Sequence, residues 1–270
     1  PISDYDGERE RGDAVNIEGD LIVITTVLLV SARLAGLLVL SPLFQFSSVP
    51  ATVRLLFVLA LSTGIVLSAS MATVSVPVTL AGLMVAMVTE VLVGAVLAFG
   101  LFAAFAAFLF GGRILDFQMG FGVANVIDPS TNVQAPMIGT ALNLMALATF
   151  FALDGHQWLI RGLVYSFNRI PPGGAFGTMS LEAVAAQFGV MFVYGMAVVA
   201  PAVITLLLVD VGMAVAARTM PQVNVFIFAL PIKIFLGLTV LALALRNVGP
   251  LLERIYESIF FYWDRVLGPA

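Results

Sequence analysis

Hydrophobic residues are grouped into long runs along most of this chain, and polar residues are concentrated in the gaps between the runs. A bilayer core requires about 20 apolar residues per helix, and several runs without a charged residue are long enough to supply one. We therefore predict an all-α integral membrane protein with about six apolar helical segments. They lie at roughly residues 21–40, 52–71, 78–110, 137–153, 187–209 and 226–245.

Polar residues mark both ends of the chain and its main internal break. Residues 1–20 are rich in Asp and Glu, and we predict that they form a polar, mobile tail. Residues 246–270 are predicted to form an amphipathic tail. The clearest internal loop signal is the run Pro171-Pro172-Gly173-Gly174, since proline and glycine both interrupt regular structure.

The third apolar segment is too long for an ordinary membrane crossing. As a helix, residues 78–110 would extend about 50 Å against a core of about 30 Å, so it must tilt, break or leave the lipid. Small residues recur in it every four positions, a spacing that lets membrane helices approach closely. Glu90 lies within this stripe, so we expect it to face protein rather than lipid. The stripe consists of Gly82, Ala86, Glu90, Gly94 and Ala98.

Composition excludes several classes of function. The chain is 61% hydrophobic and 10% charged, with no cysteine and a single histidine, so it offers no disulfides and no Cys- or His-rich metal site. It has no basic stripe for nucleic acid. We find no P-loop, no G-x-S-x-G motif and no paired-carboxylate site with a nearby base. We therefore predict a protein without enzymatic activity and without a cofactor.

A glycine-rich segment, residues 118–132, separates two apolar segments. Irregular backbone at membrane depth is tolerated where protein buries it or where it lines a water-filled cavity, so this segment could plug a pathway. It could also be an ordinary surface loop with Asp128-Pro129 opening a turn. We call it the plug loop. Its candidate gating residues are Met119, Gly120, Phe121, Gly122, Val123, Val126, Asp128, Pro129 and Asn132.

A few polar residues interrupt the apolar segments and are candidate contacts within the membrane or with partners: Arg33, Glu90, Asp210, Arg218, Gln222 and Lys233. Arg33 and Glu90 could pair with each other or with a partner chain. Asp210 and Lys233 could form an ion or proton relay. Alternatively, they flank a helix–turn–helix in which Arg218 lies near a helix C-terminus and Lys233 extends toward water.

The order of these residues resembles the FliR family, subunits of the type III export gate, from about residue 21 to the C-terminus. The resemblance is carried by Arg33, Pro42, Pro50, Arg54, Glu90 with Gly94, Gln118-Met119-Gly120, Asp128-Pro129, Gly155-His156, Asp210, Arg218, Pro221-Gln222, Asn224, Phe226, Pro231 and Lys233. It implies a FliP-like portion over residues 21–180 that includes the plug loop, and a FliQ-like helical hairpin over residues 181–245. Some helices would be held above the bilayer plane.

The resemblance also implies function and partners. One copy of this chain would join FliP and FliQ in the bacterial inner membrane, at the flagellar basal body, and FlhB would associate on the cytoplasmic side. The closed channel would conduct unfolded export substrates. This chain departs from the family pattern in two places. Relatives often carry aromatic residues at the positions of Val123 and Val126, and an acidic or neutral residue at the position of Arg113, so the roles that the family implies for these positions are less directly applicable.

Three alternatives remain open from the sequence. The host machine could be an injectisome rather than a flagellum. The chain could instead be a secondary transporter that uses Glu90, Asp210 and Lys233 as a coupling relay at a midplane site. It could also be a structural scaffold that lines no pore.

Overall fold

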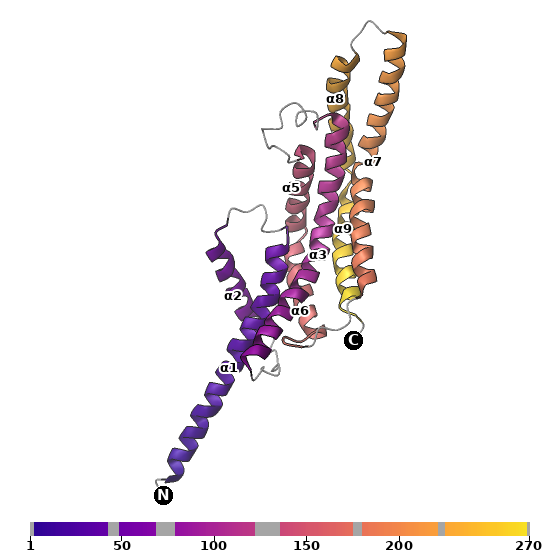
Figure 1. Cartoon of the computed structure of the whole chain (residues 1–270). Coiled ribbons are helices and arrows are strands. Elements are labelled where there is room, and N and C mark those ends of the chain that lie inside the picture. The colour runs from indigo at the N-terminus through magenta and orange to yellow at the C-terminus, as the bar shows by residue number, and fades with distance from the viewer. Residues whose placement is uncertain are drawn as a thin grey trace. The chain divides into compact units, whose positions relative to one another are not determined.

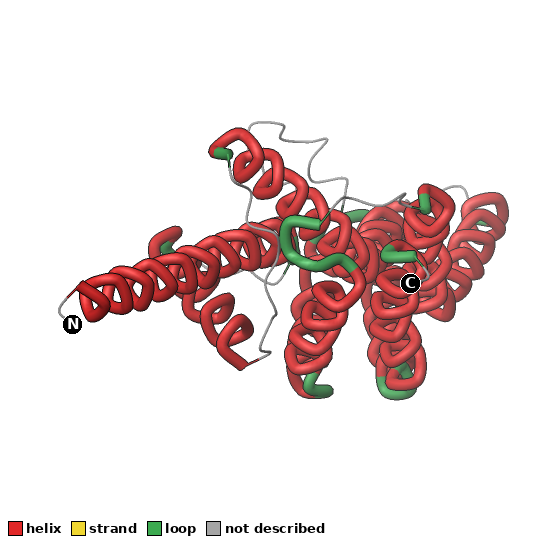
Figure 2. Tube along the Cα trace, turned by 90° about the horizontal axis from the view of Figure 1, so that it is seen from below, coloured by secondary structure: helices red, strands yellow, loops and turns green. Residues whose placement is uncertain are grey.

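The computed structural model describes residues 3–42, 49–68, 79–121, 136–174, 180–220 and 225–268; for residues 3–19 and 225–227 it describes only the backbone. All described regular structure is helical, which confirms the all-α prediction (Figure 2). The helices are α1 (Ser3–Leu40), α2 (Ala51–Ser68), α3 (Leu80–Met119), α5 (Met137–Ala152), α6 (Gly155–Arg169), α7 (Leu181–Thr219), α8 (Val225–Leu245) and α9 (Gly249–Val266) (Figure 1).

Within the described residues, five helical segments are long and apolar enough to cross a membrane, in α1, α2, α3, α7 and α8. The pair α5 and α6, bent by 74° at its junction, would be a sixth. The prediction of about six apolar segments is therefore confirmed. α3 contains 40 residues and is about 60 Å long, so it exceeds even the long segment that we predicted.

The acidic N-terminal segment that we predicted as a polar, mobile tail belongs to a helix, and its mobility stays a prediction. Helix α1 begins at Ser3, and its residues 3–20 continue without a break into the apolar residues that follow. Adding residues to an existing helix avoids the cost of nucleation, so a polar segment without proline can extend an apolar helix. At the other end, the predicted amphipathic tail is helix α9.

Helix α6 is the element that the search for apolar runs missed. It is amphipathic, with polar residues such as His156, Arg161 and Arg169 among its apolar ones. It begins directly after Asp154, whose positive φ of 57° reverses the chain at the end of α5. An amphipathic helix of this kind shows its period of 3.6 residues only within a short window.

The chain divides into two compact units. Unit 1 contains Pro1–Leu101, Leu159–Ser180 and Leu267–Ala270, and unit 2 contains Phe102–Trp158 and Leu181–Val266. The predicted division near residue 180 rests on the family resemblance and stays a prediction, since compactness does not test likeness to FliP or FliQ.

In unit 1, α1 and α3 cross at two glycines. A Cβ atom on Gly94 of α3 would collide with the backbone carbonyl of Arg33 in α1, and a Cβ on Gly36 of α1 would lie 2.6 Å from the carbonyl oxygen of Val91. The predicted small-residue stripe is therefore a real helix contact. Glu90 and Ala98, which belong to the same stripe, are 1% exposed.

The core of unit 2 is built around aromatic rings. Phe105 of α3 packs edge-on against Phe150 of α5 at 5.7 Å, and Tyr256 of α9 contacts both rings. The hydroxyl of Tyr256 donates a hydrogen bond to the carbonyl of Ala146 at 2.7 Å. α7 packs along α8 and along α9, which follow one another in the direction opposite to α7 (Figure 1).

The glycine crossing predicts a clear difference between two alanine substitutions. Gly94→Ala should destabilise the chain by about 1–3 kcal/mol, because the added methyl group meets rigid backbone. Gly64→Ala in α2 meets open space and should stabilise by up to about 1 kcal/mol, because alanine favours helix. Thermal unfolding of the chain in detergent, followed by circular dichroism, compares them. Equal effects would contradict the close approach of α1 and α3.

Candidate functional site

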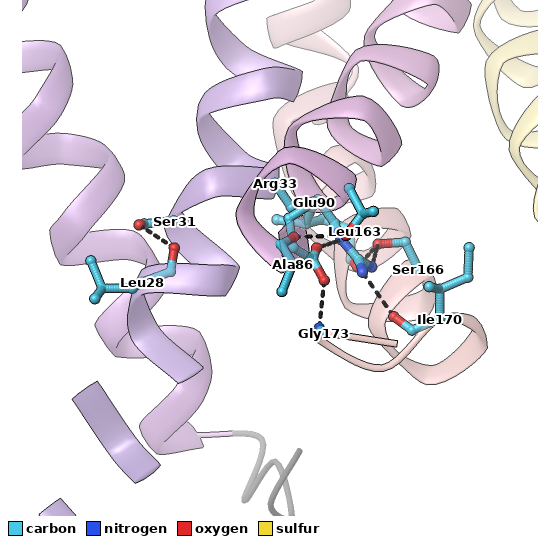
Figure 3. Close-up of polar contacts among 10 residues, drawn as sticks. Leu28, Ser31, Arg33, Ala86, Glu90, Leu163, Ser166, Ile170 and Gly173 are labelled. Atoms are coloured by element: carbon cyan, nitrogen blue, oxygen red, sulfur yellow. Dashed lines mark hydrogen bonds and ion pairs between the residues drawn. The ribbon is translucent and has the colours of Figure 1, made fainter. Parts of the chain in front are cut away.

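Unit 1 contains a buried ion pair between α1 and α3. The Nε–H of Arg33 donates to Oε2 of Glu90 at 2.6 Å, and the two side chains are 0% and 2% exposed (Figure 3). The sequence left open whether these residues pair with each other or with a partner chain. They pair with each other, so the first alternative is confirmed.

The remaining polar atoms of this pair are also hydrogen-bonded. Arg33 donates from Nη1 to the hydroxyl of Ser166 at 3.1 Å and from Nη2 to the carbonyl of Ile170 at 2.9 Å. Oε1 of Glu90 accepts a hydrogen bond from the N–H of Gly173 at 2.8 Å. The guanidinium also lies 4.3 Å from the ring centre of Phe167.

This network joins four segments of unit 1: α1, α3, α6 and the predicted Pro-Pro-Gly-Gly loop, which follows α6 (Figure 3). A buried ion pair is tolerated when hydrogen bonds satisfy the rest of each charged group, and that condition is met here. Both charges are therefore committed to holding the helices together. Gly173 has a positive φ of 75°, which glycine adopts without strain.

Unit 2 contains the beginning of the plug loop. We predicted that this loop begins at residue 118, but Gln118 and Met119 belong to the last turn of α3. The helix ends at Met119. The next residue, Gly120, has a positive φ of 87°, and the N–H of Phe121 donates to the carbonyl of Asp116 at 2.9 Å. Residues 122–135 lie outside the described part, and with them the candidates Gly122, Val123, Val126, Asp128, Pro129 and Asn132.

Met119 lies at the end of α3, and its gating role stays a prediction. Its side chain is fully buried in unit 2, and a Cβ atom on Gly237 of α8 would collide with its terminal methyl group. Met119 thus anchors the end of α3 against α8. Gly120 is also close to α8, because a Cβ there would collide with the side chain of Leu230.

The carboxylate of Asp116 joins the two sides of the plug loop. Its Oδ1 accepts a hydrogen bond from the N–H of Ile138 at 3.0 Å, and its Oδ2 accepts one from the N–H of Gly139 at 3.3 Å. These amides belong to the first turn of α5, where the preceding Pro136 supplies no side-chain cap. A carboxylate at this position satisfies unpaired N–H groups and interacts favourably with the helix dipole.

Two glycines bring the helices close enough for this contact. A Cβ atom on Gly112 of α3 would collide with the backbone of Gly139 in α5. We call the arrangement of Asp116, Gly112 and Gly139 the Asp116 clamp. It joins the end of α3, before the plug loop, to the first turn of α5, after the plug loop. Our sequence reasoning missed it, although a lone carboxylate just before a glycine-rich segment, four residues after Gly112, was a usable signal.

Asp210 and Lys233 form an ion pair between α7 and α8. The side chain of Asp210 is 43% exposed and that of Lys233 is 19% exposed. Arg218 lies in the last turn of α7 and is exposed, as predicted for a cation near a helix C-terminus. Gln222 lies outside the described residues.

The geometry offers little support for a metal centre or a relay. The described residues contain no group of three or more His, Asp or Glu side chains that could hold a metal ion. Glu90, one member of the predicted relay, accepts hydrogen bonds from Arg33 and from Gly173, one on each carboxylate oxygen. Asp210 and Lys233 neutralise each other, so each of the three charges has a structural partner.

Comparison with known proteins gives a consistent picture. The family described as "Bacterial export proteins, family 1" matches residues 24–259. Flagellar biosynthetic protein FliR of Bacillus subtilis (strain 168) is 34% identical over 237 residues, covering 85% of this chain and 90% of that protein. The protein of the same name from Escherichia coli (strain K12) is 28% identical over 229 residues, covering 84% and 87%. Yop proteins translocation protein T of Yersinia pestis is 28% identical over 147 residues, covering 53% and 56%.

The two ion pairs predict different costs when one carboxylate is neutralised. Glu90→Gln leaves the buried Arg33 charge uncompensated and should lower the free energy of unfolding by about 3–5 kcal/mol. Asp210→Asn removes the partly exposed pair and should cost about 1 kcal/mol or less. Denaturant or thermal unfolding of the purified variants measures both. A cost for Glu90→Gln as small as that for Asp210→Asn would contradict the structural role of the buried network.

Proposed function

The chain belongs to the family "Bacterial export proteins, family 1", and we propose that it is a core subunit of the flagellar type III export gate. The similarity to two FliR proteins, each covering more than four fifths of this chain, is the observation that carries the proposal. The apolar helices are compatible with a membrane-embedded component. We place it in the bacterial inner membrane, at the flagellar basal body.

In this proposal the chain acts without enzymatic activity, as one copy in a hetero-oligomer with FliP and FliQ. FlhB associates on the cytoplasmic side, and unfolded flagellar proteins pass through the assembled channel. Extensive apolar surface on the described helices supports a membrane or protein environment, since a water-soluble chain rarely exposes so much of it. This surface includes Leu56, Leu67, Val85, Leu208 and Phe235, each more than 60% exposed.

The plug loop closes the channel in the resting state. Apolar constrictions exclude water and ions by dewetting, so closure requires no titrating charge. The Asp116 clamp supports this role, because it holds the end of α3 before the loop against the first turn of α5 after the loop. Gly120, directly after α3, provides the backbone freedom that the plug loop needs to move when the channel opens.

A counterpart role in an injectisome is the second candidate, and the relative from Yersinia pestis favours it. Its match covers 53% of this chain, against 85% for the relative from Bacillus subtilis, so we prefer the flagellum. A secondary transporter is less well supported, because the three charges that it would use are already committed to ion pairs.

Assembly tests the proposed function directly. The detergent-solubilised chain, co-expressed with FliP and FliQ from the same organism and analysed by native mass spectrometry, should yield a discrete hetero-oligomer with one copy of this chain. A stable monomer or homodimer that ignores both partners would overturn the proposal.

The plug assignment predicts ion leakage. Deleting Val123–Val126 should raise the conductance of the assembled complex in a planar bilayer, because the constriction loses its apolar side chains. Asp116→Ala should also raise conductance, by a smaller factor, since it releases the ends of the loop but keeps the loop itself. Glu182→Ala, which removes an exposed carboxylate from the first turn of α7, serves as the control. Unchanged conductance in an assembled deletion variant would remove the plug assignment.

A further inference from the structure

One face of α9 borders a cavity of about 450 Å³ that lies within unit 2. Much of its wall is aromatic, with Phe150 of α5, Trp158 of α6, and Tyr256 and Phe260 of α9. The rings of Trp158 and Phe260 lie 5.9 Å apart, and those of Phe150 and Tyr256 lie 5.4 Å apart. Phe150 and Tyr256 are buried, whereas Trp158 is 53% exposed. The ring of Trp158 is therefore accessible to a ligand from outside the chain.

Two carboxylates line the same cavity. Glu253 and Glu257 are four residues apart on α9, so they lie on one face of the helix, one turn apart. Both are exposed, and neither makes an ion pair or a side-chain hydrogen bond within the described part of the chain. The described lining contains no basic residue. Two like charges at this spacing repel each other, and a cation placed between them would relieve the repulsion.

Aromatic faces and carboxylates attract the same kind of ligand. The face of an aromatic ring carries negative electrostatic potential and binds ammonium or guanidinium groups, with tryptophan the strongest of the side chains. A guanidinium group is planar, stacks on aromatic rings and donates paired hydrogen bonds to carboxylates. An arginine side chain therefore matches both features of the cavity better than a lysine does.

We propose that this cavity, which we call the α9 pocket, binds an arginine side chain of a partner protein. The pocket is concave and carries two exposed carboxylates of the amphipathic helix α9. Arginine often acts as an anchor residue at protein interfaces, and such a site suits it. The inference deepens the proposed function, because the partner would be another protein of the export apparatus. Binding of the guanidinium group can nevertheless be measured on this chain alone.

Trp158 provides the signal for the test. The chain contains two tryptophans, and Trp263 is only 2% exposed, so a Trp263→Phe variant reports on Trp158 alone. The purified full-length variant in neutral detergent is titrated with a hexa-arginine amide. A hexa-citrulline amide, which has nearly the same shape without the charge, is the matched ligand. We expect a saturable change in Trp158 emission with the arginine peptide and none with the citrulline peptide.

Charge variants then locate the binding. Glu253→Gln combined with Glu257→Gln should weaken the affinity for the arginine peptide at least tenfold. The control combines Asp20→Asn with Glu182→Gln, which removes two exposed carboxylates outside the pocket and should leave the affinity within twofold. If Trp263→Phe fails to fold, isothermal titration calorimetry on the otherwise unmodified chain makes the same comparisons.

Three results would overturn the α9 pocket. They are equal binding of the citrulline peptide, unchanged affinity in the double glutamate variant, and an equal loss in the control variant, which would indicate unspecific charge attraction. The measurement is independent of assembly with FliP and FliQ. Failure of peptide binding therefore leaves the proposed function intact, and failure of assembly leaves the pocket intact.

Discussion

The buried pair of Arg33 and Glu90 is the interaction on which unit 1 depends. Membrane helices cannot rely on the hydrophobic effect to find one another, because lipid is as apolar as their own side chains, so close packing and polar contacts between helices must decide the arrangement. Here both devices occur together. Gly94 lets α3 approach the backbone of α1 at Arg33, and the ion pair then fixes which faces of the two helices meet.

Unit 2 solves the same problem with different chemistry. Its helices are joined by edge-on aromatic contacts around Phe150, by the Asp116 carboxylate on the first turn of α5, and by glycines that remove the side chain where helices are closest. The partly exposed ion pair of Asp210 and Lys233 adds a weaker link between α7 and α8.

The sequence predicted the helical class and the apolar segments well, because length and hydrophobicity follow directly from the thickness of a bilayer. It also placed Glu90 on the protein-facing side of α3, since the small-residue stripe has a clear period. It could not decide whether Glu90 pairs with Arg33, because residues far apart in sequence meet only through the fold. The contacts of Asp116 were not predicted, because its partners are backbone amides, which residue type does not identify. The helical course of residues 3–20 was not predicted, because their acidic composition indicates a polar segment but does not show that it extends the helix that follows.

The Asp116 clamp has a consequence for how this chain can change over evolutionary time. Residues 122–135 are attached to the rest of unit 2 at a base that the flanking helices hold by their own contacts. Insertions, deletions and replacements between the two attachment points leave those contacts untouched. The length and the side chains of this segment can therefore change while the surrounding helices keep the sequence that folds them.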